Sequence, residues 1–248
     1  MSLVRDDSVS KLIALAKQED LGDGDVTTAL MPGASAVAEF TLVAKQKCVL
    51  AGRDVAEPIL AAYDPEIEMQ WSSWAEDGAR VDTIPASLAN LRGALASVLA
   101  VERVLLNFLQ RLCGVATLTN AFVDAVAGTC AGIYDTRKTI PGWRLLDKYA
   151  VRCGGGRNHR HGLFDAVLIK DNHLAGVQTE RLAGTVFEML SGVATIGKTP
   201  SFIEVEAANL AQMRELCNVV GIDVILLDNF SVSQLAEAVQ YRDAIGLR

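Results

Sequence analysis

The chain has 248 residues, 50% of them hydrophobic, which is enough for one large core or for a small domain beside an α/β domain. Its net charge of -7 and pI of about 5.0 argue against a nucleic-acid-binding surface. Apolar runs such as those at 166–169 and 224–227 are far shorter than the roughly 18 residues of a membrane helix. The N-terminus has no apolar stretch of the kind found in secretory signals, and five dispersed cysteines indicate reduced thiols in a cytoplasmic protein.

The N-terminal region contains two kinds of pattern. Residues 8–19 have apolar side chains at helical spacing, with Ser8 or Ser10 as the expected N-cap. Between residues 36 and 92, short and partly alternating segments are separated by Gly, Pro and Asp. This second pattern predicts an antiparallel sheet.

A long helical pattern follows over 94–127, and we expect it to break near Gly114. Beyond it, strand patterns alternate with helical patterns. The expected strands are 132–136, 165–171, 201–207 and 222–229. The expected helices are 144–152, 179–191, 208–220 and 231–241. Strands flanked by helices of this length predict parallel βα units, and their apolar composition predicts that both faces of the sheet are covered.

We therefore expect an α/β fold, with an incomplete (β/α) barrel over residues 114–248 preceded by a smaller α+β sandwich domain over residues 1–113. Each expected strand also carries charge at or near its end. These charged residues are Asp135, Lys170, Glu204 with Glu206, and Asp228. Active sites of parallel α/β barrels lie at the C-terminal ends of the strands. Four such strands in succession favour a functional site over a simple boundary with solvent.

Positive charge is concentrated in residues 137–173, which contain eight of the 23 Lys and Arg residues, all three histidines and only three aspartates. The basic residues are Arg137, Lys138, Arg144, Lys148, Arg152, Arg157, Arg160 and Lys170. Arginine is a planar fork for carboxylate or phosphate and lysine a compact point charge, so we expect a small anion to bind here. For Arg144, Lys148 and Arg152, spaced by four residues, an exposed helix stripe is as good an interpretation as ligand contact.

Three consecutive glycines, Gly154 to Gly156, lie inside this basic segment. They would allow an anion-binding nest of backbone N–H groups, although a flexible turn is the more common meaning of such a triplet. Neither GxGxxG nor GxxxxGK[ST] occurs, so the sequence supports neither a dinucleotide-binding fold nor a P-loop. The histidines lack the cysteine-backed spacing of a zinc site, which argues against a metal held by protein ligands alone.

The segment DTRKTIPGWRLLDKYAVRCGGGRNHRHGLFDAVLIKDNHL (135–174) is similar to the central signature of the type II, quinolinate phosphoribosyltransferases. Four further stretches resemble the family in the same order. They are EDLGDGDVTT (19–28), ERVLLNFLQRLCGVAT (102–117), FIEVEA (202–207) and ILLDNF (225–230). The resemblance covers about residues 12–241, and its many polar residues make a chance match untenable.

The resemblance implies that the chain condenses quinolinate with phosphoribosyl pyrophosphate, in the presence of Mg²⁺, and releases pyrophosphate and CO₂ to give nicotinate mononucleotide for NAD biosynthesis. Such chemistry positions and neutralises two anions and needs no covalent nucleophile, so the five cysteines are interpreted as structural.

The resemblance also implies roles for particular residues. Positions that bind the substrate match Arg137, His159 and Arg160. An arginine that reaches the partner subunit's site matches Arg103, which implies a homodimer with shared active sites. Lysines near the phosphates and carboxylates match Lys138 and Lys170. Acids around the ribose and its Mg²⁺ match Asp228 and either Glu204 or Glu206, which point to one face of the strand. The expected catalytic set is Lys138, Lys170, Glu206 and Asp228.

Two alternatives remain. A molybdate-operon paralogue of the same fold is disfavoured because the RKT and NHR pieces are both intact. A catalytically dead, anion-binding protein is the other, because the family continues beyond the position of Arg248 with elements that help bind phosphate. On that basis we expect open strand edges at Gly132 and Ile222, and weak or no turnover. We also expect a family-like C-terminal segment to raise both the melting temperature and the activity.

Overall fold

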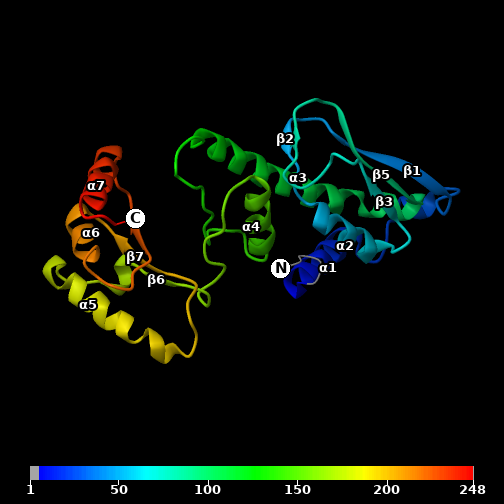
Figure 1. Cartoon of the computed structure of the whole chain (residues 1–248). Helices are drawn as coiled ribbons and strands as arrows, with labels where there is room; N and C mark the ends of the chain where they lie inside the picture. The colour runs from blue at the N-terminus through cyan, green and yellow to red at the C-terminus, as the bar shows by residue number, and fades with distance from the viewer. Residues whose placement is uncertain (1–5, 248) are drawn as a thin grey trace. The chain divides into compact units, whose positions relative to one another are not determined.

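The computed structural model describes residues 6–247, apart from the side chain of Ile196, and shows two compact units (Figure 1). The first unit ends at His159 and the second begins at Arg160. These units are defined by their compactness, so they do not test the domain boundary predicted after residue 113, which stays a prediction. Among the described residues, no helix is both long enough and apolar enough to cross a membrane.

The first unit begins with helix α1 (Asp7–Leu21), which confirms the helix expected from residue 8. Its N-cap is Asp6 and not the serine that we expected, because the Asp6 carboxylate accepts the backbone N–H of Ser8 at 2.9 Å. A short 3-10 turn, η2 (Thr28–Leu30), follows. Val9 and Ile13 of α1 are buried in the main hydrophobic cluster of this unit.

The predicted antiparallel sheet is present. Strands β1 (Val37–Ala44), β5 (Ala86–Ala94) and β3 (Glu68–Trp71) form one sheet in the order β1-β5-β3. Strands β2 (Cys48–Val49) and β4 (Arg80–Val81) pair antiparallel in a second, two-stranded sheet. Figure 1 shows β1, β3 and β5 side by side.

The sequence interpretation missed helix α2 (Arg53–Tyr63), which interrupts the region expected to be sheet. Its buried face, Val55, Ala56, Ile59 and Leu60, has helical spacing, but Pro58 inside it is typical of a boundary. The helix forms because those four side chains enter the main cluster, which also contains buried residues of the long helix α3 (Leu95–Ala125). Tertiary packing therefore outweighs the local cost of the proline.

Helix α3 (Leu95–Ala125) runs without a break through Gly114, so the predicted break was wrong. A glycine inside a helix costs about 1 kcal/mol relative to alanine. This cost is offset because a continuous face of α3 is buried on both sides of Gly114, including Leu109, Leu112 and Ala116. Helix α4 (Arg144–Cys153) packs on α3 through Leu146, Tyr149 and Ala150, which belong to the same cluster.

The strand expected at 132–136 does not form. Instead, an isolated parallel bridge joins Tyr134 to Arg157, with hydrogen bonds from Arg157 N to Ile133 O (2.8 Å) and from Asp135 N to Arg157 O (3.1 Å). The ladder ends there because the next backbone N–H, that of His159, is bonded to the Asp135 side chain. The expected open strand edge at Gly132 is therefore also wrong.

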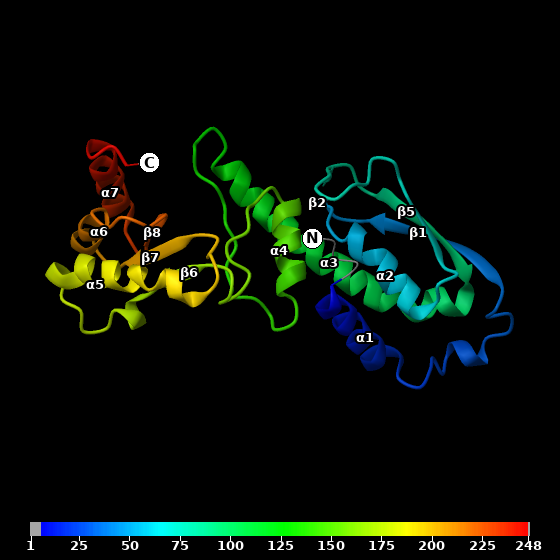
Figure 2. The same cartoon turned by 60° about the horizontal axis from the view of Figure 1, so that its bottom comes forward.

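The second unit contains three parallel strands, β6 (Val167–Ile169), β7 (Ile203–Ala207) and β8 (Val224–Leu227), in the order β6-β7-β8. Its helices are α5 (Thr179–Ser191), α6 (Leu210–Leu216) and α7 (Val232–Ala244), with 3-10 turns η3 (Asp171–His173) and η4 (Val193–Ile196). Figure 2 shows the strands beside these helices. The predicted alternation of parallel strands and helices is confirmed from residue 165 onward.

The two faces of this sheet differ, which corrects the expectation that both are covered. Residues at odd positions, such as Ile169, Val205 and Ala207, pack in one cluster with side chains of α5, α6 and α7. On the other face, Val224 and Leu226 are exposed. Strand alternation places Glu204 and Glu206 on the same face as these two residues. The described strands form an open three-stranded sheet.

Candidate functional site

A buried ion pair lies beside two of the predicted site residues of the first unit, Arg137 and His159. The ammonium of Lys148 in α4 contacts the carboxylate of Asp135, and the two side chains are only 1% and 7% exposed. Lys148 Nζ also donates to the backbone carbonyl of His159 at 2.9 Å. Buried charges persist in proteins when they are paired and hydrogen-bonded, as these are.

The same carboxylate fixes the segment that follows the glycines. Asp135 Oδ1 accepts the backbone N–H of His159 at 2.8 Å, and Asp135 Oδ2 accepts the side-chain amide of Asn158 at 2.6 Å. That amide also donates to the backbone carbonyl of Lys148 at 2.8 Å. Both backbone groups of His159 are therefore held, the N–H by Asp135 and the C=O by Lys148.

Arg137 follows Asp135 by two residues and is half-buried. Its Nε atom is buried and has no hydrogen-bond partner among the described residues, a property it shares with Tyr63 Oη and Arg111 Nε. A buried donor without an acceptor costs free energy, so a ligand that accepts from it would be stabilised here. Lys138 is exposed, and its backbone N–H donates to Thr136 Oγ1 at 3.0 Å.

The exposed stripe considered for Arg144, Lys148 and Arg152 is not what the structure contains. Lys148 is among the most completely buried large side chains of the molecule. Arg144 donates to Thr139 Oγ1 at 3.2 Å, and Arg152 to Asn158 Oδ1 at 3.1 Å. All three side chains therefore bond to other residues of the protein; Arg152 is exposed, whereas Lys148 is buried against Asp135 and the carbonyl of His159.

The glycine triplet has a structural role that excludes an anion nest. Its three N–H groups donate to the last carbonyls of α4: Gly154 N to Ala150 O (3.0 Å), Gly155 N to Arg152 O (2.9 Å) and Gly156 N to Val151 O (2.9 Å). With Gly155 at φ 84°, this is the Schellman arrangement that ends many helices.

Close packing explains the outer two glycines. A Cβ atom on Gly154 would lie 2.4 Å from Ala116 O of α3, and one on Gly156 would lie 2.8 Å from Thr119 Cγ2 of the same helix. The triplet therefore lets α4 end against α3, and its N–H groups are not available to a ligand.

In the second unit, three of the predicted charged residues lie at the carboxyl ends of the strands. Lys170 follows β6, and its Nζ lies 3.6 Å from Glu206 Oε2 on β7. Asp228 follows β8, and its backbone N–H donates to Ala207 O at 3.1 Å, which continues the ladder. Strand alternation puts Asp228 on the same face as Leu226, the register partner of Glu206.

Glu204 lies two residues earlier on β7, in register with Leu168 and Val224, and is 3% exposed. Glu206 is therefore the glutamate nearer to the carboxyl edge, beside Lys170. This distinction depends on strand register and could not be made from the sequence.

Arg160 is the first residue of the second unit and is buried, with Nη1 donating to Ala166 O at 3.4 Å. The turn after it is fixed by Asp165, whose carboxylate accepts the N–H groups of His161 (2.8 Å) and Gly162 (3.1 Å). Partial burial raises the pKa of the Asp165 carboxyl, but these backbone donors outweigh it and hold the pKa below its usual value.

Arg103 is exposed on α3, and its side chain forms no hydrogen bond or ion pair with another described residue. In the single chain, the Arg103 side chain is therefore accessible to solvent. The structure places it in the first unit, as it does Arg137, Lys138 and His159.

All five cysteines are free thiols. Burial raises the pKa of Cys113 to about 11, and burial together with the charge of Asp77 raises the pKa of Cys153 to about 12. A thiol with such a pKa carries almost no thiolate at neutral pH, so neither is suited to nucleophilic chemistry.

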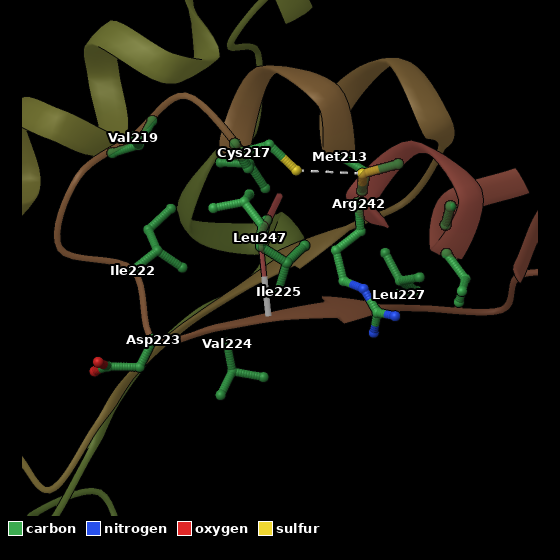
Figure 3. A pocket seen from close by; sticks show the side chains of 13 residues that line it. Met213, Cys217, Val219, Ile222, Asp223, Val224, Ile225, Leu227, Arg242 and Leu247 are labelled. Atoms are coloured by element: carbon green, nitrogen blue, oxygen red, sulfur yellow. Dashed lines mark hydrogen bonds between the residues drawn. The ribbon is translucent and has the colours of Figure 1, made fainter. Parts of the chain in front are cut away.

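Among the described residues, no group of three or more His, Cys, Asp or Glu side chains is placed to hold a metal ion. A cavity of about 460 Å³ lies between α6, β8 and α7, with mostly apolar lining that includes Ile222, Ile225 and Leu227 (Figure 3). None of the predicted site residues lines it. Its lining does not suit a dicarboxylate or a pyrophosphate.

Parallel strands with Lys170, Glu206 and Asp228 at their carboxyl ends define an α/β protein with charged side chains at one edge of its sheet. Comparison with known families then gives a more specific answer. The quinolinate phosphoribosyl transferase N-terminal domain matches residues 25–113, and the C-terminal domain of the same enzyme matches residues 115–248. The chain belongs to the quinolinate phosphoribosyltransferase family, which confirms the resemblance found in the sequence.

Named relatives and solved structures agree. The chain is 42% identical over 244 residues to the nicotinate-nucleotide pyrophosphorylase [carboxylating] of Mycobacterium leprae, covering 96% of this chain and 81% of that protein. It is 39% identical to quinolinate phosphoribosyltransferase [decarboxylating] 1b of Nicotiana tabacum, and the matched region covers 92% of this chain but only 67% of that protein. The crystal structure of NadC from Streptococcus pyogenes matches with a TM-score of 0.82 at 36% identity, over 94% of this chain and 79% of that one.

Proposed function

We propose that the chain transfers a phosphoribosyl group from phosphoribosyl pyrophosphate to quinolinate, with decarboxylation, as its named relatives do. The single observation that carries this proposal is the buried Nε donor of Arg137, which lacks an acceptor among the described residues and lies two residues after the paired Asp135. Quinolinate brings two carboxylates, and a carboxylate is the natural partner of a guanidinium fork. The products are nicotinate mononucleotide, pyrophosphate and CO₂.

In this proposal, Arg137, His159 and Arg160 recognise the quinolinate carboxylates, as the resemblance to the family implies. Lys138 supplies a further positive charge beside Arg137. The pyridine nitrogen forms a bond to ribose C1 as the bond from C1 to pyrophosphate breaks. The adjacent carboxylate then leaves as CO₂, and its electron pair passes to the cationic ring before the carbon is protonated. The cationic side chains orient the ring and need no covalent intermediate.

In the same proposal, the phosphoribosyl group is bound by Lys170, Glu206 and Asp228. Positive charge develops on the ribose as pyrophosphate departs, and the carboxylates of Glu206 and Asp228 would stabilise it. We assign this role to Glu206 in preference to Glu204 because Glu206 lies at the carboxyl edge beside Lys170.

Glu206 and Asp228 also fit the Mg²⁺ that we expect with phosphoribosyl pyrophosphate. Magnesium prefers oxygen ligands and is commonly held by one or two carboxylates together with substrate phosphates. These two acids would supply the carboxylates, and the ion would neutralise charge on the pyrophosphate. Such a shared site does not require a cluster of protein ligands.

The test is formation of nicotinate mononucleotide and CO₂ from the two substrates by the purified chain, paired with calorimetry of quinolinate binding. Arg137→Ala should weaken quinolinate binding at least tenfold, because losing a charge-assisted buried partner costs about 2–5 kcal/mol. Arg242→Ala is the control, since Arg242 pairs with the exposed Asp243. Absence of both product and quinolinate binding in the unmodified chain would remove the proposal.

We also propose a homodimer in which Arg103 of one subunit serves the site of the other. Support comes from its exposure on α3 and from the resemblance. Mixed dimers of Arg103→Ala and Lys170→Ala subunits, each inactive alone, should recover activity because one hybrid site keeps both residues. A verified mixed dimer without activity would count against shared sites.

The finer architecture is likewise proposed. We assign β6, β7 and β8 to an α/β barrel, on the basis of their parallel order and the charged residues at their carboxyl ends. A cytoplasmic location remains a prediction from cysteine usage.

A further inference from the structure

Helix α4 carries two adjacent polar side chains into the interior, and they take part in separate networks. Lys148 contacts Asp135 and the carbonyl of His159. Tyr149, 6% exposed, donates its hydroxyl proton to Asp77 and accepts the backbone N–H of Gly52 at 3.1 Å. The first network includes a proposed substrate residue, whereas the second fixes the N-terminus of α2.

A lysine ammonium that is 1% exposed needs a physical reason. Stability alone is a weak one, because replacing a buried ion pair with apolar side chains is often neutral or stabilising. What an apolar pair could not do is hold a backbone N–H and a backbone C=O of one residue at the same time. Here both backbone groups of His159 are held, by Asp135 at 2.8 Å and by Lys148 at 2.9 Å.

Asp135 also precedes Arg137 by two residues, and its backbone N–H is bonded to Arg157 O at 3.1 Å. One ion pair therefore fixes the segment that carries Arg137 against the segment that carries His159. Asn158 strengthens the junction by donating to Asp135 Oδ2 at 2.6 Å and to the carbonyl of Lys148 at 2.8 Å.

We infer that Lys148 is a positioning residue for quinolinate recognition: without touching the substrate, it sets the spacing between Arg137 and His159. The inference rests on the proposed function for the identity of the ligand. Neither an exposed position on the helix nor packing alone would give Lys148 this role.

The experiment compares two neighbouring substitutions on α4. Lys148→Met keeps the length and removes the charge, and Tyr149→Phe removes a buried hydrogen bond of the other network. We expect Lys148→Met to weaken quinolinate binding by calorimetry at least tenfold, while Tyr149→Phe changes it less than twofold. Where turnover is measurable, the KM for quinolinate should rise more in Lys148→Met than the KM for phosphoribosyl pyrophosphate. Equal losses in both variants, or unchanged binding in Lys148→Met, would overturn the inference.

Amide hydrogen exchange gives a readout that needs no substrate. Lys148→Met should speed exchange at His159 at least tenfold relative to Gly52, and Tyr149→Phe should move this ratio in the opposite direction. A general loss of stability would speed both amides and leave the ratio unchanged. An unchanged ratio in Lys148→Met therefore overturns the inference even if the unmodified chain binds no quinolinate, an outcome that would instead refute the proposed function.

If Lys148→Met does not fold, Asn158→Ala tests the same junction without leaving a charge unpaired. We expect it to weaken quinolinate binding about threefold or more and to speed exchange at His159 relative to Gly52. A folded Asn158→Ala protein with unchanged values for both would contradict the inference.

Discussion

The two groups of proposed site residues are held in place by different means. Arg137 and His159 lie in segments without regular secondary structure, and the Lys148–Asp135 ion pair with its hydrogen bonds fixes them. Glu206, by contrast, belongs to a parallel strand ladder whose backbone bonds set its position, and Lys170 directly follows the neighbouring strand β6. The difference teaches that a loop-borne site depends on a few polar side chains, whereas a strand-borne site can lose a side chain without losing its geometry.

The largest contrast should come from removing one acid in each group. Asp135→Ala leaves the Lys148 ammonium buried and unpaired, so we expect the free energy of unfolding to fall by about 3–5 kcal/mol. Glu206→Ala removes an ion pair in which Lys170 is 46% exposed, and should cost no more than about 1 kcal/mol. Urea unfolding at pH 7, followed by circular dichroism, measures both. Similar losses in the two variants would show that the distinction is wrong.

A smaller effect is expected at the glycines that end α4. Gly154→Ala places a Cβ 2.4 Å from Ala116 O, a backbone atom that cannot easily move, so we expect a loss of about 1–3 kcal/mol. Gly184→Ala in α5 is the control, because its Cβ would meet nothing within 4 Å and its helix should gain up to about 1 kcal/mol. Thermal unfolding of both variants tests this, and a Gly154→Ala protein as stable as the unmodified chain would contradict it.

The most gradual effect concerns alkaline pH and the first unit. The pKa of Cys113 is raised from 9.0 to about 11 in the folded chain, so this stabilisation is complete below pH 9 and is lost as the pH rises towards 11. In that interval the unfolded thiol binds fewer protons than the folded one, and stability should fall by up to about 1.4 kcal/mol per pH unit for this group. Burial also raises the pKa of Tyr149 and that of Cys153, which adds to the decline.

Melting temperatures between pH 8 and 10.5 measure this decline. Cys113→Ala should be less stable than the unmodified chain at pH 8 but should lose less on going to pH 10.5. Cys217→Ala is the comparison variant, because burial also raises the pKa of Cys217, but this thiol lies in the second unit. Parallel curves for the unmodified chain and Cys113→Ala would rule out the assignment to this thiol.

Much of the secondary structure could be predicted from the sequence, because local periodicity determines it. Helix α5 (Thr179–Ser191) has the predicted bounds, and the parallel strands around Ile169, Val205 and Ile225 lie where apolar runs end in charge. Failures occurred where contacts between distant residues decide. Helix α2 forms despite Pro58 because it packs on α3, and residues 132–136 are not a strand because Asp135 bonds to Lys148 and His159.

The candidate site shows the same limit. The concentration of cations in 137–173 pointed to the right segment, but one of them, Lys148, serves as an internal support. Its partner Asp135 lies 13 residues away and His159 lies 11 residues away, separations without a helical or strand period. The glycine triplet was ambiguous for a related reason: only the hydrogen bonds of its three N–H groups separate a helix end from a nest.

The distribution of the thiols offers a practical handle on the loop that contains Asp135. Burial raises the pKa of Cys48, Cys113, Cys153 and Cys217, whereas Cys130 is exposed. A maleimide dye at neutral pH should therefore attach first to Cys130, five residues before Asp135, in the unmodified chain. The chain thus contains a ready attachment point for a fluorescent reporter, whose emission could follow this segment in real time as candidate ligands are added.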